Sequence, residues 1–144
     1  MQPQKLTVSS ALHDLPRVID FVRQCCRAAG LSEDAGFACE LAADEACSNI
    51  MEHAYSGRSD GVIHVACWVT ETSFMLRFRD YGRAFDPAHV QKPILDADLT
   101  DRPVGKLGMH IMRTLMDDVC YEFDAAEGNT LTMSKTTSVW STPD

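Results

Sequence analysis

The sequence lacks the features by which membrane, secreted and zinc-binding proteins are recognised. No apolar run approaches the roughly 20 residues that a membrane-spanning helix needs, and the opening residues MQPQKLTVSS contain no apolar signal-peptide core. The six cysteines form no CxxC pair and show no cysteine–histidine spacing typical of zinc. We therefore expect a cytoplasmic protein without membrane contact, whose cysteines are reduced and mostly buried as small apolar side chains.

Basic residues are also scarce. The 13 lysines and arginines are outnumbered by 21 aspartates and glutamates, which gives a net charge of −8. Broad nucleic-acid binding needs a basic surface, so direct contact with nucleic acid is not expected, whereas a protein partner is not excluded. The chain also lacks GxxxxGKS or GxxxxGKT, the P-loop that cradles nucleotide phosphates.

What is present fits one globular domain over residues 1–144, since the chain is 45% hydrophobic and 24% charged. Hydrophobic periodicity and helix caps predict helices grouped on one face of a mixed, mainly antiparallel sheet, an α+β two-layer sandwich. The predicted elements are a strand at 5–9, helices at 14–29 and 32–55, strands at 62–69 and 73–80, a helix at 109–118, and strands at 119–123 and 129–135.

The stretch at residues 40–55, ELAADEACSNIMEHAY, carries polar residues within a predicted apolar helix face. Glu45 and Asn49 fall in the middle of this face, whereas Glu40 and Asp44 fall where solvent would surround them. Because a carboxylate buried without a partner is costly, two interpretations follow. Either polar neighbours in the core satisfy Glu45 and Asn49, or a pocket with a polar or charged ligand lies over them. The apolar members of the face are Phe37, Ala38, Leu41, Ala42, Ala46 and Ile50.

A second acid continues an apolar row in the strand at residues 73–80. Strand alternation places Phe74, Leu76, Phe78 and Asp80 on one face, toward the core. Asp80 is therefore either a ligand-facing acid or the first residue of a turn, where it would cap backbone N–H groups.

The third unusual feature is a loop at about residues 87–106, rich in proline and aspartate, that we expect to be a flexible lid. It ends at Gly105 and Gly108, just before the helix predicted to begin at residue 109. Glycines that open a helix expose N–H groups at its positive end, which suits an anion, although a lone GxxG is more often a flexible helix entry. Inward-facing acids, an amide and a phosphate cradle together are the parts of an Mg²⁺–nucleotide site.

These motifs resemble the ATPase superfamily that includes gyrase, Hsp90, histidine kinases and MutL, and within it the small anti-sigma-factor serine kinases of bacterial stress and sporulation switches. The resemblance covers nearly the whole chain. The matching segments are DEACSNIMEHAY, RDYGRAFDP, VGKLGMHIMRTLMDDV and EGNTLTM, in the family's order and spacing.

The resemblance implies a role for each matching residue. Asn49 would ligate Mg²⁺, and Glu45 would be the general base. Asp80 would bind the adenine amino group, and Gly82 would let the backbone pass close to the base. His53, at a position where the family usually has histidine, is expected to pack or hydrogen-bond at the helix end. The phosphates of ATP would lie on the segment made of Gly105, Lys106, Leu107, Gly108 and Met109.

Two positions depart from the family pattern. Ala84 stands where the superfamily has the second glycine of its first glycine box, which this subgroup often lacks. Asn129 stands after Gly128 where threonine is usual near adenine, and Thr130 follows it. Either Asn129 or Thr130 could therefore serve in nucleotide binding.

The activity implied is that of an ATP-dependent serine protein kinase and anti-sigma factor. Its substrate would be a serine on a small anti-anti-sigma protein of the STAS type, its second partner a sigma factor, and its assembly a homodimer. Two alternatives stay open. The chain could be a non-catalytic module that captures a protein partner when nucleotide is bound, or the catalytic domain of a histidine kinase, although His13 is a poor phospho-acceptor candidate.

Overall fold

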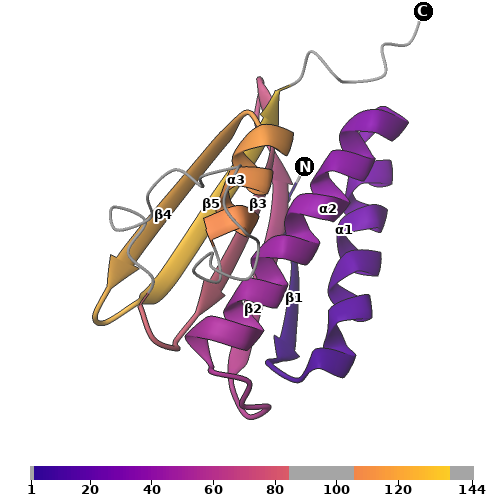
Figure 1. The fold of residues 1–144 in the computed structure, drawn as a ribbon. Coiled ribbons are helices and arrows are strands. Elements are labelled where there is room, and N and C mark those ends of the chain that lie inside the picture. Colours follow the sequence, from indigo (N-terminus) through magenta and orange to yellow (C-terminus); the bar gives the residue numbers. More distant parts are fainter. Residues whose placement is uncertain (1, 85–105, 137–144) are drawn as a thin grey trace, which may run out of the picture.

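The computed structural model describes residues 2–84 and 106–136. Within these residues five strands form one sheet, and three helices cover one of its faces (Figure 1). The elements are β1 (Gln4–Ser9), a 3₁₀ turn (Leu12–Asp14), α1 (Leu15–Ala29), α2 (Glu33–Asn49), a π-helical turn (Ile50–Ala54), β2 (Val62–Val69), β3 (Ser73–Asp80), α3 (Lys106–Leu115), β4 (Asp118–Asp124) and β5 (Gly128–Thr136).

The sheet has the strand order β1-β2-β3-β5-β4. Each recorded pair is antiparallel, so the described sheet is antiparallel throughout rather than mixed. The register places Asp80 at the end of β3 directly opposite Asn129 near the start of β5. The α+β two-layer sandwich predicted from the sequence is confirmed.

The core lies between the sheet and the helices. Phe74, Leu76 and Phe78 are fully buried on the helix-covered face of β3, as strand alternation predicts. The buried side of α2 is made of small residues, which let the helix lie close to the sheet and to α1. Its members are Ala35, Gly36, Ala38, Cys39, Ala42, Ala43, Ala46 and Cys47.

The prediction for the apolar face of α2 was partly wrong. Phe37 is 62% exposed and Leu41 39% exposed, so these two large side chains lie outside the core. The prediction included them because they are large and apolar. In the structure α1 and the sheet pack closely against α2, and only the side of α2 made of alanine, glycine and cysteine is small enough to be buried there. Glu45 and Asn49 consequently lie at the border of the buried face, half-buried, and not in its middle.

The predicted boundaries hold best for β2 and β3 and least for α3. Helix α3 begins at Lys106 rather than at Met109, so Gly108 lies inside its first turn and not before it. It ends at Leu115, and Asp118 already belongs to β4. Gly105 and the rest of the predicted lid lie outside the described residues.

Five of the six cysteines are buried with free thiols, as predicted, and Cys120 is exposed. Burial raises the pKa of the Cys47 thiol to about 12, which keeps it protonated and unreactive at neutral pH. Within residues 2–84 and 106–136, none of the helices has the length and apolar composition of a membrane span.

Candidate functional site

Asp80 is the most constrained acid of the candidate site. Its side chain is 4% exposed, and its Oδ1 accepts hydrogen bonds from the Gly82 amide at 2.9 Å and from Asn129 Nδ2 at 2.8 Å. Burial raises the pKa of this carboxyl, while the two hydrogen bonds act in the opposite direction. Asp80 therefore caps the turn after β3, which was one of the two interpretations of its position in the sequence. Both of its hydrogen bonds use the same oxygen, Oδ1.

Asn129 faces Asp80 across the β3–β5 ladder and is 1% exposed. Its Nδ2 also donates to the carbonyl oxygens of Gly82, at 3.1 Å, and Arg83, at 3.4 Å. Its Oδ1 is buried and has no hydrogen-bond partner within the described part of the chain. Buried acceptors of this kind are rare and suggest a missing donor.

Thr130, the sequence alternative to Asn129, lies on the other face of the sheet. Its register partner is Arg79, whose Nε donates to Thr130 Oγ1 at 3.3 Å. Because successive strand residues point to opposite faces, Thr130 cannot share a site with Asp80. Of the two predicted positions, Asn129 alone therefore lies on the face of the sheet that carries Asp80.

Gly82 lies in the turn after Asp80 and packs against the π-helical turn that follows α2. A Cβ at this position would clash with the backbone carbonyl of Ala54, the last residue of the π-helical turn. The next residue, Arg83, donates its amide hydrogen to Ala54 O at 2.7 Å. Contact between two backbones is thus enough to require glycine at position 82.

Glu45 and Asn49 lie one turn apart on α2, on the side that borders the core. Both are half-buried, and neither side chain makes a hydrogen bond or ion pair within residues 2–84 and 106–136. Burial, together with the negative charges of Asp44 and Glu52, raises the pKa of the Glu45 carboxyl. The polar groups of Glu45 and Asn49 are thus available to a ligand as far as the described residues are concerned.

The other acids of the helix have different surroundings. Asp44 is exposed, as predicted, and accepts a hydrogen bond from Ser48 at 3.2 Å. The prediction that Glu40 is solvated was wrong, because its side chain is 19% exposed and pairs with Arg23 of α1 at 2.9 Å. Glu40 therefore links α2 to α1 through an ion pair.

The helix that carries Glu45 ends in a π-helical turn, Ile50–Ala54, in which the Tyr55 amide reaches back to Ile50 O at 3.0 Å. Turns of this kind occur often at functional sites. His53 lies in this turn with its Nε2 buried and without a hydrogen-bond partner in the described chain. The Glu52 carboxylate, at 3.9 Å, is too distant for a hydrogen bond.

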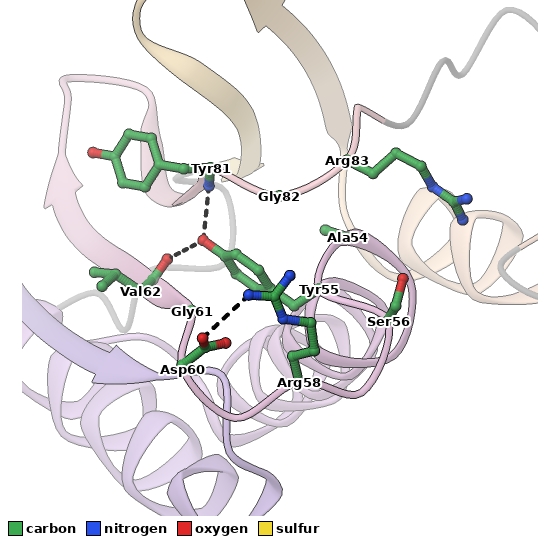
Figure 2. A pocket seen from close by; sticks show the side chains of 10 residues that line it. All are labelled: Ala54, Tyr55, Ser56, Arg58, Asp60, Gly61, Val62, Tyr81, Gly82 and Arg83. Atoms are coloured by element: carbon green, nitrogen blue, oxygen red, sulfur yellow. Dashed lines mark hydrogen bonds and ion pairs between the residues drawn. The ribbon is translucent and has the colours of Figure 1, made fainter.

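Sequence reasoning missed Tyr55. Its hydroxyl donates to Val62 O at 2.6 Å and accepts from the Tyr81 amide at 2.8 Å, so it ties the start of β2 to the end of β3 (Figure 2). It lines a pocket of about 570 Å³ whose other walls include Gly82 and Arg83. The signal was its place at the end of EHAY, but a tyrosine there has no local pattern that predicts two backbone partners.

The phosphate-binding segment is described only in part. Lys106, Leu107, Gly108 and Met109 form the first turn of α3, and Gly105 lies outside the described residues. The first-turn amides of a helix have no partner within the helix, so they are available to an anion. Further along, α3 buries Met112 and packs against α2, which brings its first turn to the same side of the sheet as Glu45 and Asn49.

Among the described residues, no cluster of three histidines, cysteines or acids could hold a metal ion.

The α+β sandwich and this arrangement of acids, amides and a helix N-terminus are features of nucleotide-binding domains that lack a P-loop, and comparison with known proteins identifies the family. The family model for the histidine kinase-like ATPase domain matches residues 8–135. The chain therefore belongs to the histidine kinase-like ATPase family.

Named relatives are protein kinases. The chain is 33% identical over 116 residues to the serine-protein kinase RsbW of Listeria monocytogenes, covering 74% of this chain and 73% of that protein. It is 34% identical over 86 residues to the serine/threonine-protein kinase BtrW of Bordetella bronchiseptica, covering 60% of this chain and 61% of the relative. A crystal structure of the RsbU and RsbW domains of a Mycobacterium tuberculosis protein has the same fold, with a TM-score of 0.67 at 18% identity, covering 94% of this chain and 32% of that one.

Proposed function

We propose that this protein is an ATP-dependent kinase that phosphorylates a serine on a STAS-type antagonist protein and that also acts as an anti-sigma factor. The relatives named above support the reaction, and the family supports ATP as the phosphate donor. The single observation that carries the proposal is Glu45, a half-buried carboxylate with a raised pKa and no partner in the described chain, one turn from Asn49.

The nucleotide would be held at two places. Asp80 and Asn129 would face the base, because both are buried, fixed and left with an oxygen acceptor that no described residue uses. The segment from Gly105 to Met109 would receive the phosphates at the first turn of α3. Lys106, with an ammonium group, suits the same anion.

Asn49 would hold Mg²⁺ through its amide oxygen. The fit rests on its chemistry, since Mg²⁺ prefers oxygen ligands and commonly uses one or two from protein beside phosphates and water. Asn49 makes no hydrogen bond within the described residues, so its oxygen is available. Bound there, Mg²⁺ would neutralise part of the phosphate charge during transfer.

Glu45 would accept the proton of the serine hydroxyl while the serine oxygen forms its bond to the γ-phosphorus and the bond to ADP breaks. Proton transfer to a positioned carboxylate contributes about 10²–10⁴ in rate. The raised pKa of Glu45 makes it a better proton acceptor than an exposed glutamate. As an anti-sigma factor, a homodimer of this chain would bind either the sigma factor or the unphosphorylated antagonist, and these two partners would compete for it.

The test uses γ-labelled ATP, Mg²⁺ and each purified STAS-domain protein of the source genome. Wild-type protein should label a serine on one of them, and Glu45→Gln should lose at least about 100-fold in labelling rate while ATP affinity is kept. Asp44→Asn is the matched control, because Asp44 is the exposed neighbouring acid. Full labelling by Glu45→Gln removes Glu45 from the mechanism. ATP-dependent capture of a STAS protein or sigma factor without labelling replaces the kinase with a binding module.

A further inference from the structure

We infer that Tyr55 is a positioning residue for nucleotide binding, because its hydroxyl holds the turn at residues 81–83 against the end of the helical segment that carries Glu45. This inference rests on the proposed nucleotide site. It concerns a residue to which the proposed function gives no part, and it assigns to that residue an effect on nucleotide affinity and not on the chemical step.

The first step is the way in which the turn after β3 is held. Its three successive amides each donate to a different acceptor: Tyr81 N to the Tyr55 hydroxyl at 2.8 Å, Gly82 N to Asp80 Oδ1 at 2.9 Å and Arg83 N to Ala54 O at 2.7 Å. Two of these acceptors belong to the end of the helical segment that begins with α2. The position of the turn is therefore set from outside its own strand.

The second step is the hydroxyl of Tyr55, which has one hydrogen. It donates this hydrogen to Val62 O, at 2.6 Å, so toward Tyr81 its oxygen acts as an acceptor. Figure 2 shows the hydroxyl between these two backbone groups. A phenylalanine would keep the ring but would remove both hydrogen bonds. One hydroxyl thus joins the start of β2, the end of the helical segment and the turn after β3.

The third step is the reason that Tyr55 reaches this position. In a continued α-helix its amide would donate to residue 51, whereas here it donates to Ile50 O at 3.0 Å, which is the π-helical register. The extra residue rotates the segment that follows by roughly 100° about the helix axis. Glycines make room for it on two sides. A Cβ at Gly61 would lie 2.5 Å from the Tyr55 ring, and a Cβ at Gly82 would clash with Ala54.

The fourth step concerns the binding of nucleotide. A ligand that contacts the turn needs it in one conformation, and its apparent affinity falls in proportion to the fraction of molecules that hold this conformation. Tyr55 keeps the turn in place before the nucleotide arrives. Glu45 and Asn49 precede the π-helical turn, within α2, so loss of the hydroxyl leaves them where they are. The effect should therefore fall on KM for ATP and spare kcat.

The experiment measures the dissociation constant of ATP by calorimetry, well below the melting temperature, for wild type, Tyr55→Phe and Tyr81→Phe. Tyr55→Phe should bind ATP at least about fivefold more weakly, the effect of one hydrogen bond, and KM for ATP should rise equally at unchanged kcat. Tyr81→Phe is the matched control, because it removes a hydroxyl from the same pocket and keeps the Tyr81 amide. If Tyr55→Phe melts lower but binds ATP as wild type does, or if both variants lose affinity equally, the inference is overturned.

Gly61→Ala tests the same contact with Tyr55 itself intact. Its Cβ would displace the Tyr55 ring, so ATP should again bind at least about fivefold more weakly, and an unchanged affinity would overturn the inference.

Hydrogen exchange separates a local effect from a general loss of stability. In Tyr55→Phe the Tyr81 amide should exchange at least about fivefold faster relative to amides in the middle of β3, whereas a general loss of stability accelerates all of them equally. Equal acceleration would count against a positioning role. Absence of ATP binding to wild type would instead remove the proposed function, so the two failures are distinguishable.

Discussion

The two ends of the candidate site differ in how far the protein itself completes them. At the Asp80 end, formed by Asp80, Gly82, Arg83 and Asn129, side chains and backbone are joined by four hydrogen bonds. At the Glu45 end, formed by Glu45 and Asn49, the side chains have no such partners in the described chain. The first end is assembled before a ligand arrives, and the second depends on what binds there.

This difference fits a division of work. Recognition of a flat, neutral base gains from fixed acceptors, because fixed groups need no ordering when the ligand binds. Phosphoryl transfer needs a metal ligand and a base that remain free to engage a cation and an incoming hydroxyl. The closed Asp80 end and the open Glu45 end therefore suit different parts of one nucleotide.

The largest expected effect comes from Asp80→Asn. The asparagine Oδ1 would keep both hydrogen bonds, but an amide nitrogen would replace the free carboxylate oxygen and oppose the adenine amine. Losing a hydrogen bond to a charged group costs about 2–3 kcal/mol, or roughly 30- to 150-fold in ATP affinity by calorimetry.

The melting temperature of the ligand-free protein should not fall in Asp80→Asn. Because burial raises the Asp80 pKa, its stabilising contribution is present at acidic pH and lost as pH rises through the folded pKa. Removal of the charge at pH 7 therefore costs no folding stability. A variant that melts lower and still binds ATP normally would show that Asp80 is only a turn cap.

Gly82→Ala tests whether the Asp80 end is held by the π-helical turn. Its Cβ would enter the Ala54 carbonyl, and overpacking of this kind costs about 1–3 kcal/mol, measurable by urea unfolding. Gly36→Ala is the control, because its Cβ would lie an ordinary 3.7 Å from Cys26 Cβ, and helical alanine is favoured over glycine. Equal stability of the two variants would contradict the contact.

How much the sequence predicted depended on how local each feature is. Strand period two is strict, so Asp80 could be placed on the core face of β3 from its own strand. The helix face was harder, because Phe37 is large and apolar yet exposed, and only the approach of α1 and the sheet determines which side is buried.

The hydrogen bonds of the Asn129 side chain could not be predicted from the sequence, because they also depend on contacts between distant segments of the chain. These hydrogen bonds depend on the register that places Asp80 opposite Asn129, 49 residues away in the chain. They also depend on the turn after β3, which points the carbonyl oxygens of Gly82 and Arg83 toward the Asn129 side-chain amide. Alternation alone left Asn129 and Thr130 as equal choices. Pairing with β3 separated them by placing Thr130 beside Arg79.

Asn49→Ala probes the open end. With Mg²⁺ present, ATP should bind about tenfold more weakly, equal to roughly 1.4 kcal/mol, because the cation loses its protein ligand. Without Mg²⁺ the affinity should hardly change, and folding stability should be kept since no hydrogen bond is lost. Ser48→Ala is the control, because Ser48 is the neighbouring residue and its hydroxyl donates to Asp44. Equal losses with and without Mg²⁺ would exclude metal ligation.

The smallest effect is on the pH dependence of phosphoryl transfer, and it tests why the Glu45 end is poised for proton transfer. A base must be ionised, so the rate should fall on the acid side with a midpoint above the ordinary glutamate pKa, because burial raises it. Asp44 and Glu52 raise it further by their charges, so Asp44→Asn or Glu52→Gln should move the midpoint to lower pH and leave the plateau rate unchanged. Asp20→Asn, on α1, should leave the midpoint where it is, since Asp20 is not among the charges that act on Glu45. A midpoint that moves in all three variants would mean that net charge, and not the surroundings of Glu45, sets the profile.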